Sequence, residues 1–199
     1  MNEKETMEIL SRCGAFIEGH FRLVSGDDSD VYVNKDAVYL NPKKVSCLAR
    51  EIANKFAKEG IEVVAGPATG GAILASWTAY YLAQKSCREV AAVYADKDNG
   101  KFIIRRGYEK AVDGKKVLLV EDIINTGESA AKTAAAVEKA GGRVVAVAAL
   151  FNRGGMTSLE DIPIKALVSK KLKSWDKEDC PLCKKGVPIN TSLGHPPTK

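Results

Sequence analysis

The chain has 199 residues, 45% of them hydrophobic, which is enough to bury the core of one α/β domain. Its formal net charge is only +5, and no basic stripe with interleaved aromatic side chains points to nucleic acid. The N-terminus, MNEKETMEIL, is no secretion signal, and no apolar run reaches membrane-spanning length. We therefore expect a cytoplasmic protein without a membrane partner, whose five cysteines are mostly reduced.

The hydrophobic pattern predicts helices and strands in alternation. Helices are expected at 3–18, from 42 to about 60, at 72–84 and at 129–140. Strands are expected on both sides of a turn at 25–28, and at 62–65, 90–94, 117–120, 144–151 and 166–169. This order predicts an α/β fold with a parallel sheet flanked by helices, in which ligands bind at the carboxyl ends of the strands.

The most informative segment is VLLVEDIINTGES, residues 117–129. Four apolar residues have the composition of a buried strand, and two adjacent carboxylates, Glu121 and Asp122, follow them. An ordinary strand-to-helix connection explains these acids poorly, because unpaired carboxylates are costly to bury. We interpret them as acceptors of hydrogen bonds from sugar hydroxyls.

The turn after the two acids predicts an anion site. Asn125, Thr126, Gly127, Glu128 and Ser129 lead into an alanine-rich helix, whose first N–H groups and dipole favour a phosphate. Gly127 allows close backbone approach, and Thr126 and Ser129 can donate hydroxyl hydrogen bonds. A ligand with a phosphate at one end and a vicinal diol nearby fits both halves, which describes a ribose 5-phosphate.

This segment resembles the phosphoribosyl-pyrophosphate (PRPP) signature of the type I phosphoribosyltransferases. The matching positions are Glu121, Asp122, Thr126, Gly127 and Ser129. The resemblance implies that the two acids bind the ribose 2- and 3-hydroxyls and that the following loop, 125–129, wraps the 5-phosphate. It also implies that Mg²⁺ arrives with PRPP and has few or no direct protein ligands.

The resemblance covers roughly residues 5–170 and implies how the chain is organised. We expect a phosphoribosyltransferase domain at 1–173, with residues 1–40 contributing to a small N-terminal hood. Beyond Lys173 the composition turns polar and proline-rich, so residues 174–199 are expected to form a short tail.

A glycine-rich turn, Gly66 to Gly71, lies between a predicted strand and a predicted helix. Alone it indicates only a tight turn, but the resemblance identifies it as the pyrophosphate loop, with a cis peptide bond joining Ala68 and Thr69. Several relatives have a lysine where Gly70 and Gly71 stand. Pyrophosphate must then be held by backbone amides of this loop and by charges from elsewhere.

Those charges could come from the polar loop expected at 96–106, which contains Lys97, Lys101, Arg105 and Arg106. Composition alone favours a solvated β-hairpin. The resemblance implies instead a mobile loop that closes over the active site, often of the neighbouring subunit of a homodimer. Lys97 is the best match for its basic catalytic group and Lys101 is second, while the family's histidine is missing here.

Two further segments bear on the acceptor base. Residues 21–32 resemble the F-x-L-x-S-G-x-x-S-x-x-Y segment of orotate phosphoribosyltransferases, which places Ser25 and Gly26 at the base together with Thr126. Arg153 matches the arginine that meets the orotate carboxylate, although an exposed arginine in a glycine turn is the simpler alternative. Val24 departs from the lysine of some relatives.

The resemblance therefore implies transfer of phosphoribosyl from PRPP to orotate, giving orotidine 5-monophosphate and pyrophosphate in pyrimidine synthesis. Two alternatives stay open. One is a transferase of the same fold that acts on a purine or another base. The other is a PRPP-sensing regulator without catalysis, which could dispense with the basic loop that this chain retains.

The tail contains a C-x-x-C knuckle, Cys180 and Cys183. A structural zinc site needs four ligands, and one pair supplies only two of them. His195, or the same pair from a second subunit, could complete the set. A pair of reduced thiols is the simpler interpretation.

Overall fold

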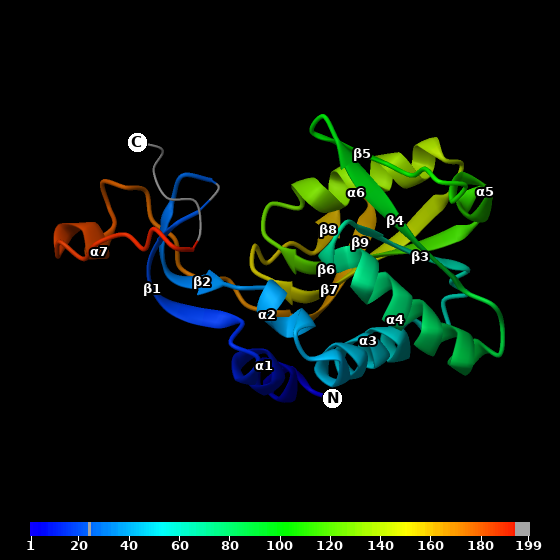
Figure 1. Ribbon diagram of the computed structural model, residues 1–199, viewed down its shortest axis with the longest axis horizontal. Helices are drawn as coiled ribbons and strands as arrows, with labels where there is room; N and C mark the ends of the chain where they lie inside the picture. The colour runs from blue at the N-terminus through cyan, green and yellow to red at the C-terminus, as the bar shows by residue number, and fades with distance from the viewer. Residues whose placement is uncertain (24, 194–199) are drawn as a thin grey trace.

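A seven-stranded sheet forms the middle layer of the protein, which a computed structural model describes over residues 1–23 and 25–193 (Figure 1). Its strand order is β5-β4-β3-β6-β7-β9-β8. The strands are β3 (Val63–Pro67), β4 (Ala91–Asp98), β5 (Lys101–Ile103), β6 (Lys116–Ile124), β7 (Arg143–Asn152), β8 (Ser158–Leu159) and β9 (Ile162–Ser169). The five inner strands are parallel, and the edge strands β5 and β8 are antiparallel to their neighbours. The expected parallel sheet is confirmed.

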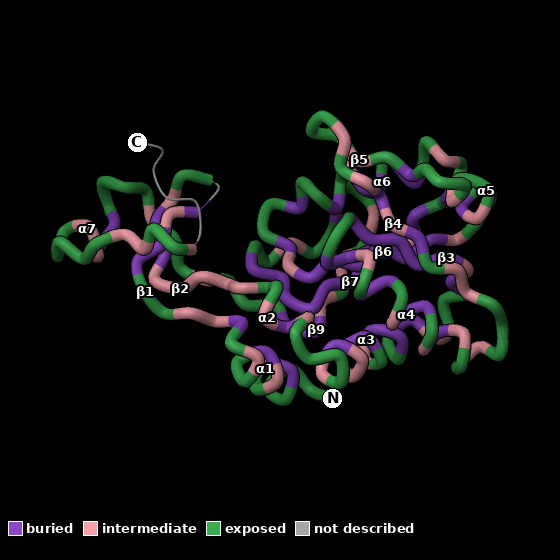
Figure 2. The backbone as a smooth tube through the Cα atoms, viewed as in Figure 1, coloured by how far each residue is buried: buried purple, intermediate pink, exposed green. Residues whose placement is uncertain are grey.

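Helices cover both faces of this sheet (Figure 1). On one face lie α1 (Glu3–Arg12), α3 (Pro42–Phe56) and α4 (Gly70–Ser86), and on the other lie α5 (Glu109–Val112) and α6 (Glu128–Lys139). Strand β6 shows why both faces must be covered. Leu118 and Val120 are buried in the core on one face of the sheet, while Val117 and Leu119 are buried in the core on the other. Figure 2 shows the central strands as the most deeply buried part of the chain.

A smaller ribbon lies beyond the edge of the helical layers. It consists of β1 (Phe16–Arg22) and β2 (Asp28–Val33), which pair antiparallel, and the short helix α7 (Pro181–Lys184) lies in the same lobe (Figure 1). The tail joins the ribbon through Asp28 and Trp175, whose backbones exchange hydrogen bonds of 2.8 and 2.9 Å. Among the described residues, no helix combines the length and apolar character needed to cross a membrane.

The helix predicted over 3–18 is too long. Helix α1 starts with a capping box between Asn2 and Glu5 and ends at Arg12. Gly14 then takes a left-handed φ of 76°, and the chain enters β1. Apolar residues of the strand continued the helical spacing by coincidence.

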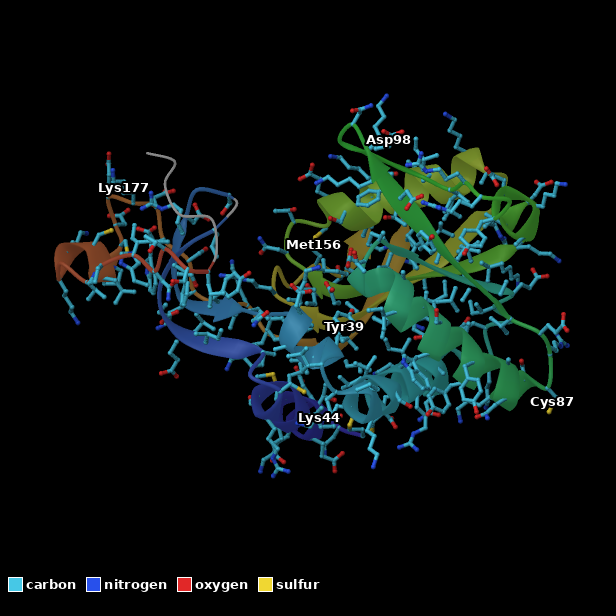
Figure 3. The ribbon with its side chains drawn as sticks, viewed as in Figure 1. Tyr39, Lys44, Cys87, Asp98, Met156 and Lys177 are labelled. Atoms are coloured by element: carbon cyan, nitrogen blue, oxygen red, sulfur yellow. The ribbon has the colours of Figure 1, made fainter. Side chains whose placement is uncertain are left out.

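Strands β6 and β4 each extend four residues beyond their predicted carboxyl ends. Strand β6 reaches Ile124, so the two acids lie inside the strand, because its pairing with β7 continues to Asn152. Strand β4 reaches Asp98 and turns back into β5, so the first part of the loop expected at 96–106 is a β-hairpin. Figure 3 marks Asp98 at the tip of this hairpin, which Figure 2 shows to be exposed.

Candidate active site

The buried carboxylates of Glu121 and Asp122 lie near the carboxyl end of β6, with 6% and 3% of their surfaces exposed. Glu121 Oε1 accepts a hydrogen bond from the backbone N–H of Asp122 at 3.2 Å, and Oε2 has no partner among the described residues. Burial raises the pKa of Glu121, and the charge of Asp122 raises it further. The site therefore presents a buried acceptor that lacks a donor, as a sugar-hydroxyl site requires.

Asp122 is paired with a cation that the sequence analysis missed. Lys35 Nζ lies 3.3 Å from Asp122 Oδ2, and the Tyr39 hydroxyl donates to the same oxygen at 3.3 Å. Burial lowers the pKa of Lys35, but the charge of Asp122, the hydrogen bond to it and the charges of Asp36 and Glu121 together outweigh burial, so this pKa lies above its ordinary value. Both residues flank the short helix α2 (Asp36–Tyr39), where Figure 3 marks Tyr39. The sequence signal that could have identified Lys35 is its position, because it is the first basic residue after the predicted pair of strands around the turn at 25–28.

The glycine turn 66–71 packs directly against these acids. A Cβ atom on Gly70 would collide with the Asp122 carboxylate and the Tyr39 ring, so only glycine allows this approach. The peptide bond between Ala68 and Thr69 is cis, as predicted. Thr69 makes no side-chain cap at the start of α4, so the first N–H groups of that helix face the site without an internal partner.

The expected phosphate loop joins β6 to α6. Gly127 is the N-cap of α6 with a left-handed φ of 77° and has no side chain to cap the helix, while the first helical N–H, that of Glu128, donates to Thr126 Oγ1 at 3.5 Å. The loop residues other than Gly127 are exposed, and the loop lines a cavity of about 330 Å³ together with Ser25. The structure thus brings the phosphate loop and the predicted base loop to one cavity, whereas Val24 lies outside the described residues.

Arg153 follows β7 and is 8% exposed, so it is not the surface arginine of the simpler alternative. Its backbone N–H donates to Ile124 O at 2.7 Å, which fixes the loop against the end of β6. Its Nη2 donates to Ser29 Oγ at 3.1 Å. Burial lowers the pKa of Arg153, and no carboxylate in the described chain forms an ion pair with it. A buried guanidinium without a carboxylate partner is a ready site for an acidic ligand.

Backbone contacts explain the asparagine and the glycines of residues 152–155, the loop that carries Arg153 (the arginine loop). A Cβ on Gly154 would collide with Asn125 O, so glycine lets this loop meet the phosphate loop. The Asn152 side chain accepts from Gly155 N at 3.0 Å and donates to Met156 O at 2.6 Å. The orientation of Arg153 is therefore set by its neighbours on both sides.

The four basic residues of segment 96–106 fall into two groups. Arg105 and Arg106 both pair with Asp96, at 2.9 and 3.1 Å. In the described chain Lys97 and Lys101 have no ion-pair partner. The Lys132 hydrogen bond chiefly, and the Lys97 charge to a lesser extent, lower the pKa of Glu128 in the phosphate loop.

Of the two hairpin lysines, only Lys97 contributes to the lowered pKa of Glu128, and it does so less than Lys132, which pairs with Glu128 at 2.7 Å. Lys101 instead lines a separate cavity of about 440 Å³ between β5 and α6. Neither lysine lines the cavity of the phosphate loop within this one chain, so their predicted roles stay predictions.

The two tail cysteines lie in the lobe of the N-terminal ribbon. Cys180 and Cys183 meet His20 and Asp28, so that one ligand atom from each lies within 4.8 Å of the others. His20 belongs to β1. His195, proposed as a zinc ligand, lies outside the described residues.

Comparison with known proteins agrees with this arrangement. Residues 35–181 match the family model of the phosphoribosyl transferase domain. The chain belongs to the phosphoribosyltransferase family. It is 36% identical over 189 residues to an orotate phosphoribosyltransferase of Thermoanaerobacter sp. (strain X514), covering 95% of this chain and 96% of that protein.

Solved structures of this family share the fold. An orotate phosphoribosyltransferase of Mycobacterium tuberculosis H37Rv superposes with a TM-score of 0.68 at 24% identity, covering 84% of this chain and 95% of that one. An adenine phosphoribosyltransferase of Rhodothermus marinus DSM 4252 reaches 0.62 at 20% identity, covering 84% and 99%. The fold alone therefore does not decide the acceptor base.

The raised pKa of Glu121 predicts an unusual pH dependence of stability. Above the ordinary pKa of 4.5 the folded state holds a proton that the unfolded state releases, so the free energy of unfolding falls as pH rises towards the folded-state pKa. The loss is at most about 1.4 kcal/mol per pH unit. Glu121→Gln should therefore gain stability relative to the wild type between about pH 4.5 and pH 7.5 in urea unfolding.

Glu128→Gln is the matched control, because the pKa of exposed Glu128 is shifted the other way. It should show no such gain. Parallel stability curves for the wild type and Glu121→Gln across this pH range would contradict a carboxyl group that resists ionisation.

Proposed function

We propose that the protein is an orotate phosphoribosyltransferase, which transfers phosphoribosyl from PRPP to orotate and releases pyrophosphate. The observation that carries the choice of base is the buried Arg153 guanidinium, which has no ion-pair partner in the described chain and whose backbone is hydrogen-bonded to Ile124 just before the phosphate loop. Orotate has the carboxylate that such a group would bind, whereas uracil, adenine and hypoxanthine do not. The name of the Thermoanaerobacter relative supports the same assignment.

PRPP would extend across the carboxyl ends of β3 and β6. Its 5-phosphate is assigned to the loop 125–129, where the first amides of α6 and the hydroxyls of Thr126 and Ser129 are available. Its ribose hydroxyls are assigned to Glu121 and Asp122, and its pyrophosphate to the backbone of 68–70. Lys35 would supply the positive charge that the glycine turn lacks, since it lies against Asp122.

The donor atoms at this site suit Mg²⁺, because the side chains that face the ribose are carboxylates and this ion prefers oxygen ligands. We expect it to be held mainly by PRPP, with few or no direct protein ligands, and to neutralise charge on the diphosphate. The protein groups act around it by orienting the ribose and by excluding water from the buried end of β6.

The reaction breaks the bond between C1 of the ribose and the pyrophosphate oxygen, and forms a bond between C1 and a ring nitrogen of orotate, whose N–H proton is released to pyrophosphate or to solvent. Positive charge develops on the ribose ring, and the carboxylate of Asp122 stabilises it, joined by that of Glu121 once this group has given up its proton. Negative charge grows on pyrophosphate, and Lys97, with Lys101 as the second candidate, offsets it when the hairpin closes. Ser25, Gly26 and Thr126 border the base, and Arg153 fixes its orientation.

The organisation of the chain follows from these assignments. We propose a catalytic domain over 1–173, to which the ribbon within 1–40 contributes a hood, and a tail from 174. The hairpin carrying Lys97 would be donated across a homodimer interface.

Arg153→Ala should lower kcat/KM for orotate by about 10²-fold or more, because loss of one partner of a buried charge pair costs about 2–5 kcal/mol. The PRPP dissociation constant of the free enzyme should barely change, since the phosphate loop is intact. Steady-state kinetics and PRPP binding by calorimetry measure the two quantities. Arg88→Ala, an exposed arginine in the connection after α4, is the control. Unaltered orotate kinetics in Arg153→Ala would remove this residue from base recognition.

Lys35→Ala should weaken PRPP binding by roughly tenfold, because a charge-assisted contact at a partly buried site contributes about 1.5–3 kcal/mol. The KM for orotate should change less than the KM for PRPP. Lys43→Ala, an exposed lysine at the start of α3, is the matched control. Equal PRPP affinity in the wild type and Lys35→Ala would show that Lys35 serves only the Asp122 pair.

Sharing of the hairpin predicts complementation between two inactive variants. Asp122→Asn should lower kcat by roughly 10²-fold, as expected for one preorganised electrostatic group. If Lys97 acts across the interface, equal mixing of Lys97→Ala with Asp122→Asn should restore up to about a quarter of wild-type activity, since half the dimers are mixed and each holds one intact site. Verified mixed dimers without recovered activity would place Lys97 in its own subunit's site.

A further inference from the structure

Four potential metal ligands converge in the lobe formed by the ribbon and the tail. They are His20 Nε2 from β1, Asp28 Oδ2 from β2, and the Sγ atoms of Cys180 and Cys183 at α7. Residues 20 and 28 are separated from the cysteines by about 150 positions of sequence, so the fold alone brings the four together. None of them belongs to the proposed catalytic site.

Three of the four short separations between these atoms match the edges of a zinc tetrahedron, and the fourth is slightly shorter. The two sulfur atoms lie 3.5 and 3.7 Å from His20 Nε2, Asp28 Oδ2 lies 3.4 Å from that nitrogen, and Cys183 Sγ lies 3.1 Å from Asp28 Oδ2. With Zn–S near 2.3 Å and Zn–N or Zn–O near 2.0–2.2 Å, a tetrahedral ion requires edges of about 3.3–3.8 Å. One ion at the centre would contact all four atoms after only small shifts.

Three of the four ligands are also held by a neighbour that orients them. His20 Nδ1 lies 2.7 Å from Val187 O, so this nitrogen donates its proton to the carbonyl and leaves the lone pair of Nε2 facing the cluster. Arg22 Nε donates to Asp28 Oδ1 at 2.7 Å, which leaves Oδ2 for the cluster. The backbone N–H of Cys183 donates to Cys180 Sγ at 3.5 Å. Such supporting contacts are typical of ligands rather than of incidental neighbours.

The ligand set indicates both the metal and its role. Two thiolates, one imidazole and one carboxylate suit Zn²⁺ better than Mg²⁺ or Ca²⁺, which prefer oxygen. His20, Asp28 and Cys180 are buried, and four protein ligands leave no open position for a substrate, which is the pattern of a structural site.

We propose that this cluster is a structural Zn²⁺ site that fastens the tail to the N-terminal ribbon. The site would also brace the base pocket through the next residue along β2. Ser29, beside Asp28, donates to Lys173 O at 2.8 Å and accepts from Arg153 Nη2 at 3.1 Å. The zinc thereby holds in place the strand that positions Arg153.

Metal content of the full-length protein tests the site directly, and independently of the reaction that the protein catalyses. After expression with added zinc and extensive dialysis, mass spectrometry of the metals should find about one Zn²⁺ per chain in the wild type. Cys183→Ser and His20→Gln should each bind it at least tenfold more weakly. Cys87→Ser is the control, because Cys87 is exposed at the end of α4.

Replacement of the zinc by Co²⁺ in the wild-type chain tests the same site by its absorption spectrum, so the test does not depend on a variant that folds well. The wild-type chain refolded with Co²⁺ should show the intense visible bands of a tetrahedral ion and thiolate charge-transfer absorption, whereas the Cys183→Ser chain should lose part of the latter. A wild-type protein without zinc, or one with a disulfide between Cys180 and Cys183 after purification under reducing conditions, would overturn the proposal.

Discussion

The organisation of this protein depends on placing two adjacent carboxylates at the buried carboxyl end of a central parallel strand. Burial of such groups is costly, and in Glu121 the cost is visible as a raised pKa and an unpaired Oε2. The surroundings offset only part of it, through Lys35 and Tyr39 at Asp122. A fold optimised for stability alone would not retain this pair, whereas a site for a ribose diol requires it.

The parallel sheet explains why the remaining groups gather around these acids. Carboxyl ends of neighbouring parallel strands meet at one edge, so the turn after β3, the phosphate loop after β6 and the arginine loop after β7 become adjacent. Glycines at 70 and 154 make the contacts possible, because a side chain at either position would strike the neighbouring segment. The ribbon then brings Ser25 and Ser29 to the same region, opposite the arginine loop. In the proposed assignment, specificity for the base therefore depends on a part of the chain that is remote in sequence from the phosphate loop.

The sequence was sufficient for the features that depend on local pattern. The buried strand β6, the helix after it, the cis bond at Ala68 and the parallel sheet all follow from periodicity, turn chemistry or the resemblance of a short motif. Errors occurred where tertiary pairing overrides local preference. Pairing with β5 turned part of a polar loop into a hairpin, and pairing with β2 ended a helix early.

Contacts between distant segments were the features that sequence reasoning missed. Nothing local pairs Lys35 with Asp122, 87 positions away, and nothing local brings His20 and Asp28 to the tail cysteines. A C-x-x-C pair predicts half of a zinc site, and only the fold supplies the other half. The predicted roles of Lys97 and Lys101 depend on a second subunit and therefore stay predictions.

Pyrophosphate release from PRPP with a panel of bases tests the central claim most directly. The panel is orotate, uracil, adenine and hypoxanthine, each assayed with Mg²⁺ and the wild-type chain. If the buried acids bind the ribose and Arg153 reads a carboxylate, release should depend on orotate and should exceed that with any other base by about 10²-fold or more. Release with a purine and none with orotate would contradict the base assignment, and PRPP binding without release to any base would contradict catalysis.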